Sequence, residues 1–313
     1  MSKPYLTTRD DAPAYWLVET LWRLHADAQR TGGAVSLMEQ LMPGGMGPPA
    51  HFHRKSEEMF FVLQGTVLFH LSGQEIKAGP STAILLPPGL PHGFEVVGGE
   101  AQVLNAYAPA GFEAVVMSLG RPAAEPRRPA PQDSMPLGGE AQIRLLSETF
   151  DQHGAPALPF LTPTQRTMLK TVGDPSRPGA VIVQADEASS REVFGSTWRT
   201  LLSSKSIGMA LVSQPSGSGM PHHSVNHARL IYMLDGVLDA TIDGSNGIAT
   251  TGTSIWLPAG AATQWDATSR SEILLFNLPG TSKPAAHYPV SFDDGLKMAG
   301  YAFGEEVRDG QDD

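Results

Sequence analysis

The stretch FVLQGTVLFHLSGQEIKAGPSTAILLPPGLPH, residues 61–92, recurs in altered form as YMLDGVLDATIDGSNGIATTGTSIWLPAGAAT, residues 232–263. The two copies align without a gap at an offset of 171 residues, so that, for example, Gly65 falls on Gly236. Both copies are short runs rich in Val, Ile, Leu, Phe and Tyr, separated by turns that contain Gly or Pro. This pattern is typical of strands in a β-sandwich or barrel. The sequence therefore predicts an all-β protein built from two similar barrels with a few short helices.

The two copies are separated by a Pro-rich segment, GRPAAEPRRPAPQDSMP, at residues 120–136. Proline removes a backbone donor and fixes φ, so this segment is predicted to form neither the interior of a helix nor a central strand. We expect three regions. They are an N-terminal metal-binding barrel over residues 1–125, a linker with a short helix over 126–160, and a C-terminal barrel without metal ligands, ending in an acidic tail, over 161–313.

Two segments outside the repeat need separate arguments. WLVETLWRLHADAQ, residues 16–29, fits a helix about as well as a strand. The pair Trp22-Arg23 recurs at Trp198-Arg199, and this duplication favours a strand. In GEAQIRLLSETFDQHG, residues 139–154, the apolar residues have helical spacing, which predicts a short helix with Gly154 as its end.

The composition bounds the chemistry. The chain of 313 residues has 33 Gly and 26 Pro but no Cys, which suits a turn-rich β protein and excludes disulfides, thiolate nucleophiles and cysteine-based metal sites. Any metal must therefore be held by nitrogen and oxygen ligands.

The formal net charge of −10 includes an acidic tail at residues 305–313, and no basic stripe is present. Nucleic acid is therefore not expected as a partner. The first residues, MSKPYLTTRDD, lack the basic and apolar regions of a signal peptide, and no apolar run has the length of a membrane span. We expect a cytoplasmic protein without a membrane partner; a homo-oligomer remains an open alternative.

The stretch HFHRKSEEMFFVLQG, residues 51–65, carries the first candidate metal ligands. Alternate residues of a strand share a face, so His51 and His53 can each give one imidazole nitrogen to a common ion. Glu58 begins the next hydrophobic run, and the turn in LLPPGLPHGF delivers His92 at the start of another strand. The sequence predicts a metal site of three imidazoles and one carboxylate.

Glu57 is the alternative carboxylate ligand, but strand alternation and the spacing to the following glycine favour Glu58. The donor set suits one divalent transition metal, Fe, Mn, Ni, Co, Cu or Zn, and ligand type alone does not choose among them. Phe60 and Val62 share strand parity with Glu58. They are predicted either to line a substrate pocket or to form ordinary core.

The second copy tests this prediction. At the same offset His51 maps to His222, but the positions of His53, Glu58 and His92 hold other residues: Ser224, Arg229 and Thr263. An arginine in place of the carboxylate repels a dication. We therefore expect the second barrel to be free of metal and to serve packing.

These residues resemble the two motifs of the cupin superfamily. The first motif, with its spacing of glycine, His-x-His, glutamate and glycine, is matched by Gly45, His51, His53, Glu58 and Gly65; the second is matched in part by Pro87, Gly89 and His92. Ser81 and Val96 depart from the second motif, at turn positions rather than at ligands.

The segments APAYWLVETLWRLHADAQRTGGAVSLMEQLMPGGMGPPAHFH, from residue 12, and NAYAPAGFE, residues 105–113, further resemble bacterial bicupins related to quercetin 2,3-dioxygenase. This resemblance implies a jelly-roll fold, a divalent metal in the first barrel, and O2-dependent cleavage of a flavonol or similar enol-bearing aromatic.

Three functional hypotheses follow. The first is a metal-dependent dioxygenase whose partners are a small aromatic substrate and O2, with Glu58 as catalytic base for the enol proton. The second is a non-oxidative cupin enzyme, such as a cyclase, isomerase or decarboxylase, that uses the same metal as Lewis acid. The third is a small-molecule binding protein without catalysis.

Overall fold

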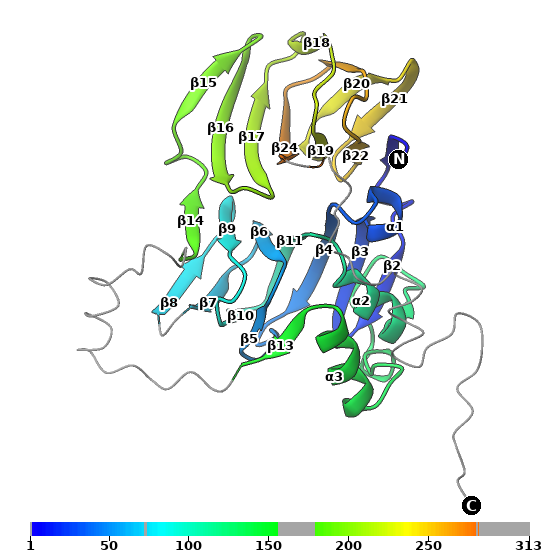
Figure 1. The fold of residues 1–313 in the computed structure, drawn as a ribbon, viewed down its shortest axis with the longest axis vertical. Coiled ribbons are helices and arrows are strands. Elements are labelled where there is room, and N and C mark those ends of the chain that lie inside the picture. Colours follow the sequence, from blue (N-terminus) through cyan, green and yellow to red (C-terminus); the bar gives the residue numbers. More distant parts are fainter. Residues whose placement is uncertain (1, 72–73, 156–178, 280, 282–313) are drawn as a thin grey trace, which may run out of the picture.

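The computed structural model describes residues 2–71, 74–155, 179–279 and 281. Antiparallel strands dominate, and they form two barrels stacked one above the other (Figure 1). Barrel one, lower in Figure 1, consists of an eight-stranded and a five-stranded sheet; barrel two consists of a seven-stranded and a four-stranded sheet. The prediction of an all-β fold with two jelly-roll barrels is confirmed.

Barrel one encloses its core between two unequal sheets. Its large sheet has the order β12 (Arg121–Pro122), β2 (Ala14–Leu17), β3 (Thr20–Ala26), β4 (Ser36–Pro43), β11 (Glu100–Ala108), β6 (Glu57–Gln64), β9 (Thr82–Leu86), β14 (Val181–Gln184). Its small sheet has the order β13 (Gln152–Gly154), β5 (His51–His53), β10 (His92–Val96), β7 (Val67–Leu71), β8 (Gln74–Ala78).

Barrel two repeats this plan. Its large sheet has the order β1 (Tyr5–Thr7), β22 (Ser254–Leu257), β19 (Ala228–Asp235), β24 (Ser271–Leu278), β17 (Gly208–Gln214), β16 (Ser196–Ser203), β15 (Ser190–Val193). Its small sheet has the order β18 (Gly219–His223), β23 (Thr263–Ala267), β20 (Val237–Ile242), β21 (Ser245–Thr250). The bounds of β19 equal those of β6 displaced by the offset of the sequence repeat.

The two barrels exchange edge strands. β1, near the start of the chain, pairs with β22 of barrel two, whereas β14 pairs with β9 of barrel one. Residues on either side of the Pro-rich segment therefore contribute to both barrels. The exchange joins the barrels through backbone hydrogen bonds as well as through side-chain packing.

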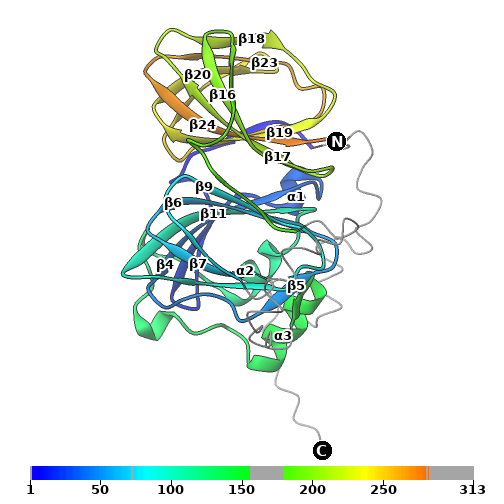
Figure 2. The same cartoon turned by 90° about the vertical axis from the view of Figure 1, so that its left-hand side faces the viewer.

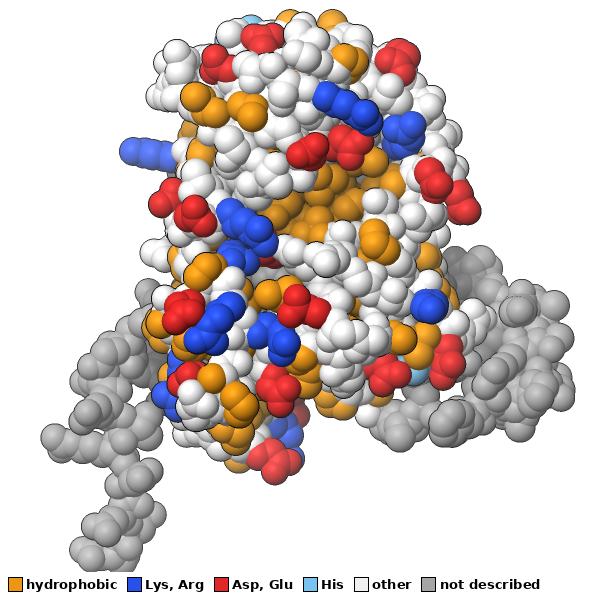
Figure 3. Space-filling view, turned by 180° about the vertical axis from the view of Figure 1, so that it is seen from behind, with side chains coloured by type: hydrophobic (Ala, Val, Ile, Leu, Met, Phe, Trp, Pro, Cys, Tyr) orange, Lys and Arg blue, Asp and Glu red, His pale blue; other side chains and the backbone are white. Residues whose placement is uncertain are grey.

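The large sheets of the two barrels pack face to face. On β6, Phe60 and Val62 point into the core of barrel one, while Met59 and Phe61 belong to a separate apolar cluster shared with barrel two. Both faces of this strand are buried, which explains why its sequence is an unbroken hydrophobic run rather than an alternating one. Seen from behind, the surface where the barrels meet is hollowed and lined by hydrophobic side chains (Figure 3).

Glycine is required at the hairpin between β6 and β7. Gly65 has a φ of 80°, and a Cβ atom placed on it would lie 2.2 Å from the carbonyl oxygen of Glu100. Gly236 occupies the same turn of barrel two, with a φ of 87° and a similarly close carbonyl at Arg270. The glycine shared by the two sequence copies is thus fixed by a close backbone approach.

The helices are short: α1 (Ala28–Thr31), α2 (Glu113–Leu119), the 3-10 turn η1 (Pro131–Asp133) and α3 (Glu140–Thr149). α3 confirms the helix predicted within 139–154, but it ends before Phe150 rather than at Gly154, which lies in β13. α3 lies at the side of barrel one away from barrel two (Figure 2). The ambiguous segment 16–29 forms the end of β2 and the whole of β3, the strand that the repeat favoured, followed by the start of α1.

No helix among the described residues is long and apolar enough to cross a lipid bilayer.

Candidate metal centre

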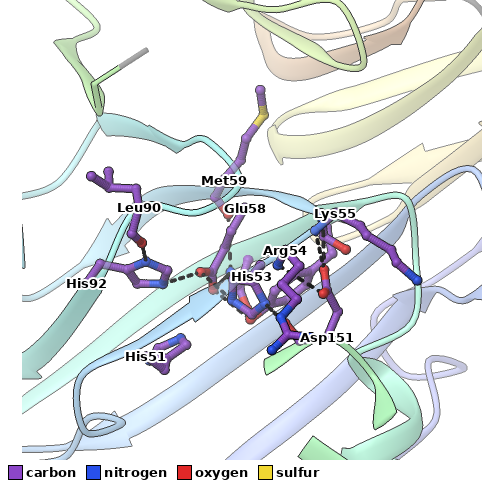
Figure 4. A network of polar contacts seen from close by, with 12 residues as sticks. His51, His53, Arg54, Lys55, Glu58, Met59, Leu90, His92 and Asp151 are labelled. Carbon is purple, nitrogen blue, oxygen red and sulfur yellow. Dashed lines mark hydrogen bonds and ion pairs between the residues drawn. The ribbon is translucent and has the colours of Figure 1, made fainter. Parts of the chain in front are cut away.

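Four buried side chains converge inside barrel one. His51, His53, Glu58 and His92 each offer a ligand atom, and these atoms all lie within 4.8 Å of one another. The residues are only 1–3% exposed. Figure 4 shows the three imidazoles and the carboxylate facing a common point. The structure thus brings together all four predicted ligands.

Strand pairing explains this convergence. His51 on β5 lies directly opposite His92 on β10 in the small sheet. His53 is two residues further along β5 and therefore points to the same face. Glu58 comes from β6 of the large sheet, on the strand face that carries the inward Phe60. Ligands from both sheets therefore meet between them.

Each imidazole is oriented by a backbone carbonyl. Nδ1 of His51 lies 2.9 Å from the carbonyl oxygen of Pro49, and Nδ1 of His92 lies 2.8 Å from that of Leu90. Nδ1 of His53 lies 2.9 Å from the carbonyl oxygen of Asp151. A carbonyl can only accept, so all three Nδ1 atoms carry the proton and Nε2 presents a lone pair. This is the arrangement by which proteins prepare histidines for a metal.

Glu58 has a different partner on each carboxylate oxygen. Oε1 accepts hydrogen bonds from the hydroxyl of Tyr107 at 2.6 Å and from Nδ2 of Asn105 at 3.0 Å. Oε2 lies 2.8 Å from Nε2 of His92 and 3.2 Å from Nε2 of His53. One oxygen is therefore anchored by the protein, and the other faces the imidazole nitrogens.

The contacts around Oε2 fit a cation. With Nδ1 protonated, Nε2 of a neutral imidazole and a carboxylate oxygen both present lone pairs, which repel unless a proton or a cation lies between them. Nε2 of His53 is also buried and has no hydrogen-bond partner in the part of the chain that the structure describes. Buried unpaired acceptors of this kind are costly. The residues present therefore fit a divalent transition metal with nitrogen and oxygen ligands.

Electrostatics inside the cluster favour ionised Glu58. Burial alone raises the pKa of Glu58, but its close contacts with the imidazoles of His53 and His92, which favour its negative charge whenever either ring is protonated, outweigh burial and hold that pKa well below its usual value. Burial lowers the pKa of His51 to about 4, with the neighbouring His92 adding to the effect. Burial and the charge of Glu58 raise the pKa of Tyr107 well above its usual value, which keeps its hydroxyl a donor.

Asp151 also supports the site, and sequence reasoning missed it. Its carboxylate accepts hydrogen bonds of 2.8–2.9 Å from the backbone N–H groups of Arg54, Lys55 and Ser56, the turn between β5 and β6. Its carbonyl orients His53 (Figure 4). Because about a hundred residues separate it from this turn, no local spacing could have indicated the contact.

Asn105 and Tyr107 were likewise not predicted as site residues. They lie on β11, where Tyr107 pairs directly with Glu58 across the strands. Their role depends on the register between β11 and β6. The sequence did indicate that Asn105 and Tyr107 share a strand face, because they alternate within NAYA, residues 105–108.

The other predicted residues have distinct positions. The side chain of Glu57 points away from the cluster and accepts a hydrogen bond from the hydroxyl of Ser204 in barrel two, so Glu58 is the carboxylate of the cluster. Phe60 and Val62 are fully buried in the core of barrel one. The ring of Phe60 packs edge-on against Phe69, with centroids 5.2 Å apart. Their contact with a substrate remains a prediction.

In barrel two, the strand pairing corrects one detail of the repeat. The offset maps His51 to His222, but His223 is the residue that pairs with Thr263, as His51 pairs with His92. Nδ1 of His223 also lies 2.8 Å from the carbonyl oxygen two residues earlier, as in His51. An irregularity between Met220 and His223 shifts the register of β18.

Comparisons with known proteins agree with this fold. Among solved structures, the protein Ylba from E. coli matches with a TM-score of 0.58 at 13% identity, over 88% of this chain and 93% of that chain. Oxalate decarboxylase from Bacillus subtilis, in a structure at pH 4.6, matches with a TM-score of 0.57 at 14% identity, over 89% of this chain and 77% of that chain. At these identities the likeness concerns the fold.

Sequence comparison identifies the family as well as the fold. The uncharacterized protein MJ1618 of Methanocaldococcus jannaschii is 31% identical over 96 residues, which are 31% of this chain and 70% of that protein. The family model described as "Cupin domain" matches residues 37–107, the part of barrel one that holds Glu58, His92 and their supporting residues on β11. With its two antiparallel barrels and its cluster of three histidines and one glutamate, the chain belongs to the cupin family.

Proposed function

We propose that this chain is a metal-dependent cupin dioxygenase that cleaves a flavonol, such as quercetin, or a related enol-bearing aromatic with O2. The observation that carries the proposal is the orientation of the four side chains toward one point. Three Nε2 atoms and one carboxylate oxygen converge, and Nδ1 of each histidine is hydrogen-bonded to a backbone carbonyl. A cluster held in this way is suited to a bound, reactive ion rather than to a packing role.

The proposed metal ligands are His51, His53, Glu58 and His92. When bound there, a divalent transition metal supplies Lewis-acid polarisation of a substrate oxygen. The chain's own residues then orient the substrate and handle its proton.

Glu58 is the proposed base. Tyr107 and Asn105 hold Oε1, so Oε2 would have to serve in turn as metal ligand and as acceptor of the proton from the substrate's enol hydroxyl. The low pKa of Glu58 keeps it ionised before the proton arrives, and the raised pKa of Tyr107 keeps its hydroxyl donating to Oε1. Phe60 and Val62 lie on the same strand face in the apolar core beyond Glu58, and an apolar surrounding of this kind suits a flat aromatic ring.

A non-oxidative reaction is the second candidate. The solved structures that match this fold include Bacillus subtilis oxalate decarboxylase, one of them described by its Mn(II) centers. Three imidazoles and one carboxylate also suit Mn(II), and a carboxylate that accepts a proton can serve a lyase as well as a dioxygenase.

The test begins with metal analysis of the purified full chain, followed by assays of the metal-loaded protein. We expect O2 consumption matched by loss of quercetin absorbance. CO2 release from oxalate without O2 consumption would instead favour the second candidate. Absence of bound metal after loading with each of the six candidate metals would contradict both.

Variants of the adjacent glutamates sharpen this test. Glu58→Gln should retain the three imidazoles yet lose most turnover, because the amide cannot accept the proton. Glu57→Gln is the matched control, since its side chain faces Ser204 rather than the cluster. Equal turnover in the metal-loaded E58Q and E57Q proteins would remove Glu58 from the role of base.

A further inference from the structure

Arg229 occupies in barrel two the strand position that Glu58 occupies in barrel one. Each is the second residue of its strand, β19 or β6. Glu58 pairs with Leu86 on β9, and Arg229 pairs with Leu257 on β22, its counterpart in the sequence repeat. The position that carries a negative charge in one barrel therefore carries a positive charge in the other.

Arg229 is buried, with only 4% of its surface exposed. Its Nη1 donates to Nε2 of His223 at 2.7 Å, while Nδ1 of His223 donates to the carbonyl of Pro221 at 2.8 Å. Since Nε2 accepts this bond, His223 is neutral. Burial also lowers the pKa of His223, which favours the neutral form. His223 thus contacts the guanidinium without compensating its charge.

The rest of the guanidinium is unpartnered. Nε and Nη2 of Arg229 are buried and have no hydrogen-bond partner, and no acidic side chain of the described residues forms an ion pair with them. Burial lowers the pKa of Arg229 to about 10, so it remains charged at neutral pH. A buried, unpaired cation is one of the most costly features a fold can contain.

The two free nitrogens define the shape of the missing partner. The N–H bonds of Nε and Nη2 lie on one edge of the planar guanidinium and point in parallel. This edge matches the two oxygens of a carboxylate, which can accept both hydrogens at once. A carboxylate bound there would neutralise the charge and satisfy both donors.

The surroundings suit a small ligand. β18 carries the partly exposed His223, next to the exposed His222, so the buried guanidinium is in contact with a residue that reaches the surface. The ring of His223 lies 5.9 Å from that of Trp265, and Thr263 is buried opposite His223 in the strand pairing. Aromatic and hydroxyl groups therefore accompany the charge.

We propose that barrel two binds a small organic carboxylate, held by Nε and Nη2 of Arg229. This site is separate from the metal cluster of barrel one and goes beyond the function proposed for that cluster. Duplication of the barrel has in this view given two sites of opposite charge: one selects a cation and the other an anion.

The experiment uses the metal-loaded full chain, and the probes are acetate, oxalate and benzoate. Because carboxylates can also bind a metal, the readout is local: the Nε–H signal of Arg229 in a nitrogen–proton correlation spectrum, assigned by its absence in Arg229→Lys. At least one probe should shift this signal saturably, whereas chloride should not. No saturable shift up to tens of millimolar would overturn the proposal, as would equal affinity for inorganic sulfate.

Variants give a second, independent measurement by calorimetry. Arg229→Met should lose the carboxylate binding that this site contributes. Arg229→Lys should weaken that binding roughly 10- to 100-fold, because lysine keeps the positive charge but cannot donate two parallel hydrogen bonds to a carboxylate. Arg270→Met is the matched control, since Arg270 is exposed and its ion pair among the described residues is with Glu272 at 3.9 Å. Unchanged carboxylate binding in R229M would refute the assignment.

R229M could also bind carboxylate weakly because the substitution disturbs the fold. Thermal unfolding separates this case from the loss of a binding site. Without carboxylate, R229M should be at least as stable as the parent protein, because it removes a buried unpaired charge. With carboxylate, the melting temperature of the parent should rise by more than that of R229M, because any binding at the metal is common to both proteins. A large destabilisation of R229M in the absence of carboxylate would mean that the guanidinium is already satisfied, and would overturn the proposal.

Discussion

The hydroxyl of Tyr232 on β19 donates a hydrogen bond of 3.0 Å to Oε2 of Glu39 on β4, joining the two barrels through a buried carboxylate. The other oxygen, Oε1, accepts from Arg9 at 2.6 Å, Arg23 at 2.8 Å and Gln102 at 2.8 Å. These donors come from β3, β11, β19 and the segment before β2 that carries Arg9. Glu39 therefore links a polar cluster of barrel one to β19 of barrel two.

Removing the Tyr232 hydroxyl should weaken this contact. In Tyr232→Phe, Oε2 of Glu39 loses its hydroxyl donor, and we expect a loss of about 1–3 kcal/mol in the free energy of unfolding, the range for a buried acceptor left without its partner. Urea denaturation measures the change. Tyr15→Phe, at a partly exposed ring, should alter stability by less than about 0.5 kcal/mol, and an equally small effect of Y232F would mean that Glu39 does not depend on barrel two.

The surroundings of Glu39 also predict that the folded protein loses stability in acid. Burial lowers the pKa of His25, whose Nε2 lies 3.4 Å from Oε2 of Glu39. Burial alone raises the pKa of Glu39, but His25 and Arg9 outweigh it and hold that pKa below its usual 4.5. Both groups bind protons more readily in the unfolded chain, so stability should fall with decreasing pH, first below the usual histidine value of 6.5 and further below 4.5.

His25→Phe isolates the first of these steps. Phenylalanine keeps a ring of similar shape against Tyr232, where the two rings meet edge-on at 5.1 Å, but it cannot titrate. The slope of stability against pH between 6.5 and 5 should therefore become shallower, by at most about 1.4 kcal/mol per pH unit for one proton. Urea denaturation over this range measures both proteins. Parallel curves would show that His25 does not contribute.

The hairpin glycines give a matched pair. In Gly65→Ala the new Cβ would lie 2.2 Å from the carbonyl oxygen of Glu100, whereas in Gly98→Ala nothing lies within 4 Å; both positions have positive φ. We expect G98A to lose about 1 kcal/mol through backbone strain alone, and G65A to lose more than about 2 kcal/mol because the strand pairing must also shift. Thermal or urea unfolding compares them, and equal losses would contradict the close approach.

The sequence predicted those features of the site that are local. His51, His53 and Glu58 lie within eight residues, and strand alternation alone places the two histidines on one face. The repeat supplied the barrels, because short strands that recur at a fixed offset leave few other architectures. These inferences needed no knowledge of how distant strands pair.

Features that depend on long-range pairing could not be predicted. The three-residue β1 and four-residue β14 carry too little pattern to reveal that each joins the other barrel. The slip that puts His223 rather than His222 opposite Thr263 arises from an irregularity in β18, and a one-residue slip reverses the face of every side chain. Arg229 was read only as a missing ligand, since its free nitrogens are visible only in the packed barrel.

A variant of Asp151 tests whether a residue outside the four ligands contributes to metal affinity. Its carboxylate fixes the turn of Arg54, Lys55 and Ser56, and its carbonyl fixes the ring of His53. In Asp151→Ala three backbone N–H groups lose their acceptor, so the turn that leads from His53 to Glu58 should loosen. We expect metal affinity to fall roughly 10-fold, the lower end of the range for a lost outer partner of a metal ligand, because the carbonyl that orients His53 remains in the variant.

Competition with a chelator of known affinity measures this fall. Asp239→Ala, at an exposed position on β20 of barrel two, removes the same charge without touching the turn and should leave metal affinity unchanged. Asp151→Asn should lie between the two, because its amide oxygen still accepts while the charge is lost. If D151A bound metal as tightly as D239A, the pairing of β5 with β13 and β10 would suffice to hold His53, and the carboxylate of Asp151 would serve only the stability of the turn.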